Sequence, residues 1–164
     1  MKVIFLDVDG VLNSDEYFDK IAGLNIQGVE SQVDINKIRL LQKAVRDTGA
    51  KVVLSSSWRN TRMGQELRNL LLSYGLFTDV TPYMKNQRGK EIKEWLSNKG
   101  EIEDFVILDD EVFDSFGEKL LEKLIKISDG NGKNFGEGLQ EKDVEQIIQR
   151  LGRKKNREHE DEER

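Results

Sequence analysis

The sequence contains no cysteine and only one histidine, His159, which lies in a highly charged C-terminal stretch. The absence of cysteine excludes disulfides, thiolate nucleophiles and zinc–thiolate sites. A histidine in a segment without large apolar residues is a poor candidate for a Ser-His-Asp triad or for a histidine-rich metal site. An enzyme with this sequence must therefore work with carboxylates, hydroxyls, lysine and arginine, together with a hard metal ion.

The chain also lacks any apolar run long enough to span a membrane. Asp7 and Asp9 interrupt the N-terminal apolar stretch, so we expect no signal peptide and a cytoplasmic protein. The formal net charge of −5 gives no general case for nucleic-acid binding but leaves room for a local basic patch. With 164 residues, 37% hydrophobic and 35% charged, we expect one domain with a compact core and a charged surface.

Apolar runs and helical spacings alternate along the chain. The runs predict strands at 2–6, 51–54, 77–80 and 105–108, and a further strand within 121–127. Apolar residues at helical spacing predict helices over 34–46, 63–71, 90–98 and 144–151, the first with Asp34 as its N-cap. This alternation predicts an α/β fold with three Rossmann-like layers, in which helices cover both faces of a mainly parallel sheet.

Three segments lack clear periodicity. Residues 14–33 are expected to form a loop or a small lid, and the glycine-rich residues 129–138 a flexible loop. The basic and acidic halves of residues 152–164 nearly cancel, as is typical of a disordered, solubilising tail. We therefore expect a domain over residues 1–151, followed by this tail.

Polar residues follow three of the predicted strands: Asp7 and Asp9, Ser55 and Ser56, and Asp109 and Asp110. The ends of parallel strands meet at one edge of the sheet, where open α/β sheets bind ligands. Carboxylates from two loops would form an oxygen-rich site for magnesium. Hydroxyls, backbone amides and a cation would complete a site for a phosphoryl group. The serines could instead cap the helix that follows them.

The order of these motifs resembles that of the haloacid dehalogenase-like (HAD) superfamily, most of whose members are magnesium-dependent phosphatases. The matching segments are Asp7-Val8-Asp9-Gly10-Val11-Leu12, Val53-Leu54-Ser55-Ser56, Arg88-Gly89-Lys90 and Ile107-Leu108-Asp109-Asp110. The resemblance spans residues 1 to about 151. The chain departs from the family at the third motif. The family often has a lysine directly before the glycine, whereas here Arg88 stands before Gly89. Either Lys90 supplies the expected charge or Arg88 replaces the lysine, and these side chains are not equivalent.

The resemblance implies a role for each motif. Asp7 would attack phosphorus and form an aspartyl-phosphate, and Asp9 would exchange protons with the leaving oxygen and with water. Mg²⁺ would bind Asp7, the backbone carbonyl of Asp9 and a carboxylate of Asp109 or Asp110.

The phosphoryl oxygens would be bound by the second and third motifs. Ser55, or Ser56 if the strand is one residue longer, would donate a hydrogen bond to them. Lys90 or Arg88 would neutralise their charge.

The spacing of the motifs leaves no room for a cap domain, so the site should be open. An open site suits a phosphorylated substrate that is bulky, such as a nucleic-acid end, a nucleotide or a protein. Trp58-Arg59 and the compact layout resemble the phosphatase modules of nucleic-acid repair proteins. Trp58 could stack on a base, although packing is the favoured interpretation. The alternative function is a non-enzymatic receiver-like or interaction module that binds magnesium and phosphate.

Overall fold

The computed structural model describes residues 1–127 and 136–155. The predicted glycine-rich loop at 129–138 lies mostly outside the described residues. The same holds for the predicted tail at 152–164, including His159.

Five parallel strands form the sheet, in the order β3-β2-β1-β4-β5. They are β1 (Lys2–Leu6), β2 (Lys51–Leu54), β3 (Phe77–Val80), β4 (Asp104–Asp109) and β5 (Leu124–Lys126). The chain builds outward from β1 in one direction through β2 and β3, and then in the other through β4 and β5. The central β1 is almost wholly buried, as expected of a parallel sheet covered on both faces. The change of direction between β1 and β4 opens a crevice at the carboxyl ends of these strands.

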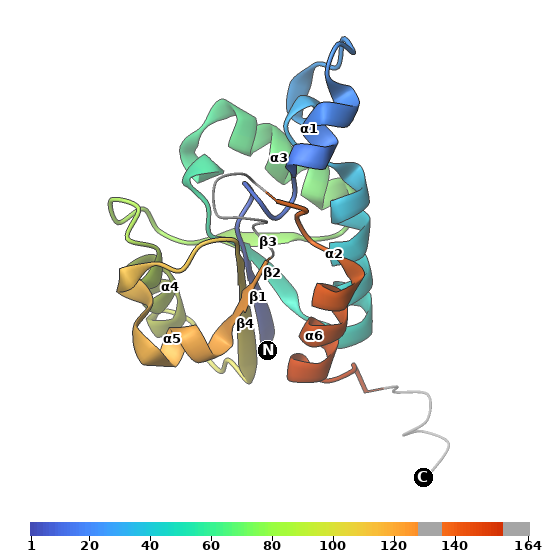
Figure 1. The fold of residues 1–164 in the computed structure, drawn as a ribbon. Helices are drawn as coiled ribbons and strands as arrows, with labels where there is room; N and C mark the ends of the chain where they lie inside the picture. Colours follow the sequence, from blue (N-terminus) through green and yellow to red (C-terminus); the bar gives the residue numbers. More distant parts are fainter. Residues whose placement is uncertain (128–135, 156–164) are drawn as a thin grey trace.

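Helices cover both faces of the sheet and create the three expected layers (Figure 1). One face packs against α2 (Ile35–Thr48), α3 (Arg62–Ser73) and α6 (Glu141–Leu151), and the other against α4 (Arg88–Ser97) and α5 (Gly117–Lys123). Successive strand residues point to opposite faces, so Ile4 belongs to the first core and Phe5 to the second. Trp95 of α4 meets Phe5 edge to face, with ring centroids 5.4 Å apart, and belongs to the core as predicted.

Helix α2 shows how the sequence sets the limits of an element. The Asp34 side chain accepts a hydrogen bond from the Asn36 amide and caps the helix, as predicted. Gly49 ends it in the left-handed conformation, with φ of 74°.

One segment differs from the sequence-based expectation. Residues 14–33 are not a simple loop, because they form α1 (Asp15–Ile21) and a 3-10 turn, η1 (Gly28–Ser31). Helix α1 projects from the top of the domain in Figure 1, and none of its seven residues is fully buried. The strand predicted within residues 121–127 is confirmed as β5, which directly follows α5.

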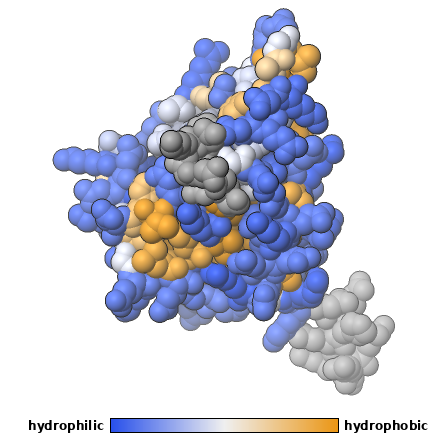
Figure 2. Space-filling model, viewed as in Figure 1, coloured by the Kyte–Doolittle hydropathy of each residue, from blue (hydrophilic) through white to orange (hydrophobic). Residues whose placement is uncertain are grey.

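The surface is mainly hydrophilic, with an apolar area between α5 and α6 in the view of Figure 2.

Two further 3-10 turns complete the fold. η2 (Ser57–Asn60) follows β2, and η3 (Asp114–Phe116) precedes α5. Within the described residues, no helix is both long and apolar enough to cross a membrane.

Candidate phosphoryl-transfer site

Asp7 lies directly beyond the last residue of β1, in the crevice between β1 and β4. Its backbone amide donates to the Leu108 carbonyl at 3.1 Å, which continues the pairing with β4. The Asp7 side chain is buried. The chain turns sharply at Gly10, whose φ is +78°. A Cβ atom at Gly10 would lie 2.1 Å from Oδ2 of Asp110, so the close approach of these two loops requires glycine here.

Three carboxylates gather at this edge of the sheet. Asp7, Asp109 and Asp110 each offer an oxygen, and these oxygens all lie within 4.8 Å of one another. Asp7 comes from the end of β1, and Asp109 and Asp110 from the end of β4. Asp9 is not a member of this cluster, so its predicted metal contact through the backbone carbonyl stays a prediction.

Arg88, the first residue of α4, enters the same cluster. Its Nη1 lies 2.7 Å from Oδ2 of Asp109 and 3.2 Å from Oδ1 of Asp7, and its guanidinium carbon is 4.9 Å from the centre of the Phe113 ring. Arg88 is 7% exposed, whereas Lys90 is exposed and lines a hollow outside the crevice. Of the two candidates for the third motif, the structure brings Arg88 to the acids.

The electrostatics of the cluster favour a cation. Burial raises the pKa of Asp7 to about 6, and the Arg88 charge opposes this shift. Burial and the neighbouring charge of Asp7 raise the pKa of Asp109 to about 9. Burial, with the charge of Glu111, also raises the pKa of Asp110. Three carboxylates face one guanidinium, so a hard divalent cation with oxygen ligands fits these residues.

The two serines after β2 have different partners. The Ser55 amide donates to the Leu6 carbonyl at 2.8 Å, which places Ser55 beside the end of β1. Its hydroxyl is fully buried and has no hydrogen-bond partner within the described residues. The Ser56 hydroxyl accepts a bond from the Trp58 amide at 3.2 Å and caps η2. Helix capping, one of the two interpretations of this run, therefore applies to Ser56, and the Ser55 hydroxyl is left for a ligand.

Asp9 is held by two side chains that sequence analysis did not connect to it. The Trp58 indole Nε1 donates to Oδ2 of Asp9 at 3.2 Å, and the Asn13 amide nitrogen donates to Oδ1 at 3.1 Å. Asn13 is buried and also accepts a bond from the Gly10 amide at 2.8 Å. Trp58 is half-buried and packs against the first core, and its hydrogen bond to Asp9 was not expected. Asn13, close after the first motif, was the one signal that could have been read from the sequence.

A second buried arginine ties the crevice to the loop before α4. Arg59 donates to the Ser56 carbonyl at 2.6 Å and forms an ion pair with Glu91 of α4. The same Glu91 oxygen accepts a bond from the Met84 amide at 2.8 Å. Arg59 and Glu91 are almost wholly buried. This pair was missed because its members are 32 positions apart and each looks like an ordinary surface residue.

Comparisons with known proteins agree with this geometry. No curated protein and no solved structure matches the chain. The family model described as "HAD domain in Swiss Army Knife RNA repair proteins" matches residues 3–144. That range holds β1 to β5, the acid cluster, Ser55 and Arg88. The chain therefore belongs to this family of HAD domains, and it has the HAD-like α/β fold without a large cap domain.

Proposed function

We propose that this HAD-type domain is a magnesium-dependent phosphomonoesterase that acts on phosphorylated nucleic-acid ends through an aspartyl-phosphate on Asp7. One observation carries the proposal. The buried Asp7, after the central strand β1, lies between Asp109 and Asp110 at the end of β4 and Ser55 after β2, whose buried hydroxyl has no hydrogen-bond partner among the described residues. This combination supplies a nucleophile, a cation site and a donor for a phosphoryl oxygen in one crevice.

In the first step, an Asp7 carboxylate oxygen forms a bond to phosphorus as the bond from phosphorus to the leaving oxygen breaks. Asp9, in its protonated form, gives its proton to that leaving oxygen, which departs as an alcohol. In the second step, water attacks phosphorus and the bond between Asp7 and phosphorus breaks. Asp9 takes the proton from this water, and inorganic phosphate and free Asp7 are released. The bonds from Trp58 and Asn13 hold Asp9 in position for both transfers.

Asp7, Asp109 and Asp110 would hold the magnesium ion. When bound, Mg²⁺ supplies positive charge that offsets the repulsion between the anionic nucleophile and the anionic phosphate. The Ser55 hydroxyl would donate to a phosphoryl oxygen, and Arg88 would keep Asp7 in place and add positive charge.

The family description and the open layout support a nucleic-acid substrate. Between β1 and α2 the chain adds only α1 and η1, and between β3 and α4 only a short loop. Neither insertion is large enough to enclose a small metabolite. The matched family is described from RNA repair proteins, which supports an RNA end as the substrate.

The test is hydrolysis of 3′- and 5′-phosphorylated oligonucleotides, nucleotides, sugar phosphates and phosphopeptides, with magnesium and with a chelator. We expect Asp7→Asn to lower kcat by roughly 10⁴- to 10⁶-fold, the range seen when an enzyme loses a principal catalytic group. Asp104→Asn is the matched control, because Asp104 begins the strand that Asp109 ends and lies at the opposite edge of the sheet.

Three outcomes would contradict parts of this proposal. Undiminished activity of Asp7→Asn would exclude Asp7 as the nucleophile. Equal turnover with magnesium and with a chelator would show that the acid cluster does not need a bound metal ion for catalysis. A long-lived phosphoprotein without release of phosphate would favour the receiver-like alternative.

A further inference from the structure

The loop between β3 and α4 has both ends fixed at the candidate site. At one end, the Thr81 amide donates to the Leu54 carbonyl at 3.0 Å, next to Ser55. At the other, Arg88 contacts Asp7 and Asp109. Whatever extends from a phosphate in the crevice therefore meets this loop as a neighbouring surface.

The buried ion pair described above positions the first half of the loop. Glu91 accepts bonds from both Arg59 and the Met84 amide, so it fixes the loop against the turn that follows β2. The Arg59 guanidinium carbon lies 5.7 Å from the centre of the Tyr83 ring. Tyr83 is nevertheless 59% exposed. An aromatic ring supported by a buried cation and open to solvent is a platform on which a base can stack.

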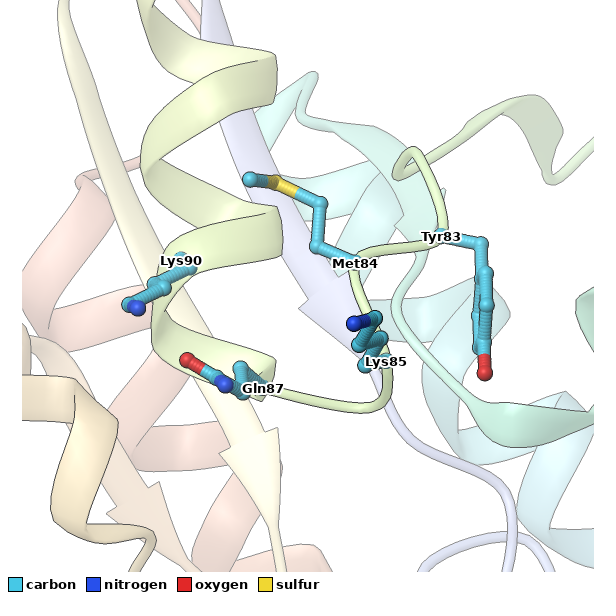
Figure 3. A pocket seen from close by; sticks show the side chains of 5 residues that line it. All are labelled: Tyr83, Met84, Lys85, Gln87 and Lys90. Carbon is cyan, nitrogen blue, oxygen red and sulfur yellow. The ribbon is translucent and has the colours of Figure 1, made fainter.

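The second half of the loop is basic. From Thr81 to Lys90 the chain carries three positive residues and no acid, in a protein of net charge −5. Arg88 belongs to the crevice, but Lys85 and Lys90 are exposed and line a hollow of about 390 Å³ with Tyr83, Met84 and Gln87. Figure 3 shows Lys85 and Gln87 turned toward Lys90, and Tyr83 on the other side of the chain. An aromatic ring for stacking and lysines for charge neutralisation suit a nucleic-acid strand that crosses the loop.

The backbone of the loop adds a further observation. Lys85 and Asn86 have φ values of +56° and +60°, and they are the two non-glycine residues with positive φ within the described residues. This conformation is unfavourable for a lysine, and such residues cluster at sites that bind ligands. The bend at Lys85 and Asn86 lies between Tyr83 and Lys90, which both line the hollow.

We propose that residues 83–90 bind single-stranded nucleic acid next to the reacting phosphate. Tyr83 stacks on the terminal base, and Lys85 and Lys90 neutralise the backbone phosphates that follow. The location rests on the proposed phosphatase function, whereas the binding itself does not require catalysis. A phosphopeptide would use the lysines but would leave the supported aromatic ring without a role, so we favour nucleic acid.

The test is fluorescence anisotropy with the full chain and a labelled single-stranded octanucleotide without a terminal phosphate, as RNA and as DNA. We expect Tyr83→Ala to weaken binding by roughly 5- to 150-fold, the usual effect of losing a stacked base, and Tyr83→Phe to bind like the wild type. Lys85→Gln and Lys90→Gln should each lower the slope of log affinity against log salt by about 0.7. Lys142→Gln, an exposed lysine of α6, is the matched control and should leave the slope unchanged.

Equal binding by wild type and Tyr83→Ala would overturn the proposal, as would a salt slope that the two loop lysines do not change. Binding of a phosphopeptide in place of both oligonucleotides would also overturn it. Thermal unfolding checks that Tyr83→Ala is folded, and if it is not, the exposed lysine variants decide. Loop-dependent binding by a protein that hydrolyses no phosphate would uphold this surface and refute the phosphatase. Hydrolysis of phosphorylated oligonucleotides with a KM that Tyr83→Ala leaves unchanged would uphold the phosphatase and refute this binding surface.

Discussion

Arg88 and Arg59 are both buried, both lie near an aromatic ring and both contact a carboxylate, yet their surroundings differ in charge. Arg59 meets a single carboxylate, Glu91, and the other hydrogen bonds of the pair are with backbone groups. Arg88 meets Asp7 and Asp109, which lie together with Asp110. The first group has one carboxylate for its guanidinium, whereas the second has three. The balance of charge, more than burial, separates a structural ion pair from a candidate catalytic one.

The largest effect on stability should come from breaking the pair of Arg59 and Glu91. Glu91→Gln keeps the shape of the side chain but leaves the Arg59 charge buried and unpaired, so we expect a loss of about 3–5 kcal/mol in the free energy of unfolding. Asp109→Asn should cost far less, because it relieves repulsion among the carboxylates around Arg88. Denaturant unfolding without metal measures both changes.

The exposed pair between Lys123 and Asp104 provides the control for this measurement. Asp104→Asn should change the free energy of unfolding by less than about 1 kcal/mol, since a partly exposed ion pair contributes little. If Asp109→Asn were the more damaging change and Glu91→Gln mild, the roles assigned to the two arginines would be wrong.

Magnesium should have an effect of intermediate size on the free energy of unfolding, through the cluster of Asp7, Asp109 and Asp110. The folded protein holds protons on Asp7 and Asp109 above the ordinary pKa of 3.8, so without metal these groups lower the free energy of unfolding as pH rises from about 4 to 9. Mg²⁺ binds the ionised carboxylates, so the stabilisation it provides should grow over the same range. At one hundred times Kd it should reach about 2.7 kcal/mol.

Thermal unfolding between pH 6 and pH 9, with and without magnesium, measures this stabilisation. Asp109→Asn should abolish the magnesium-dependent rise in Tm, whereas Asp104→Asn should retain it. A rise in Tm of the same size at every pH would show that the ion does not compete with protons at the cluster.

The smallest effect, a modest fall in kcat, is expected at Trp58, which links the region of Arg59 to the catalytic crevice. It precedes Arg59 in η2, and its indole donates to Asp9. Trp58→Phe removes one hydrogen bond and should lower kcat by about 2- to 13-fold. The reduction should be larger for an alkyl phosphate than for p-nitrophenyl phosphate, because Asp9 protonates the leaving oxygen and a good leaving group needs little protonation.

Trp95→Phe is a close control, since the Trp95 indole also donates to an aspartate, Asp79, at 2.9 Å. Trp95 belongs to α4 and packs on the opposite face of the sheet, against Phe5. Its substitution should alter stability without any dependence on the leaving group. The same dependence in both variants would mean that Trp58 acts through packing alone.

The strands and most of the helices could be predicted, because their apolar spacing follows from burial on two faces of a sheet. The four runs from 2–6 to 105–108 became β1 to β4 with little change. Helix α1 escaped prediction because it has only seven residues, none of them fully buried, and is too short for a clear apolar period. Helix α5 was not predicted, because it has only seven residues and leads directly into β5.

The positions of Asp7, Ser55, Asp109 and Asp110 were predictable, because each follows or ends a strand and parallel strands end at the same edge of the sheet. The choice between Arg88 and Lys90 could not be made, because two positions at a helix start point in different directions and only the packing of α4 decides between them. The bond from Trp58 to Asp9 spans 49 positions and depends on the path of η2, which no local pattern encodes.

The small space above Gly10 is shared between two distant parts of the chain, since the Asp110 carboxylate occupies the volume where a Cβ would lie. The first and fourth motifs therefore interlock. A larger side chain at position 10 could be accommodated only if residue 110 became smaller, and that change would remove a carboxylate from the cluster. A redesigned turn that no longer needs a positive φ at position 10 would still place its Cβ against the Asp110 carboxylate. Positions 10 and 110 should therefore be altered together or left alone.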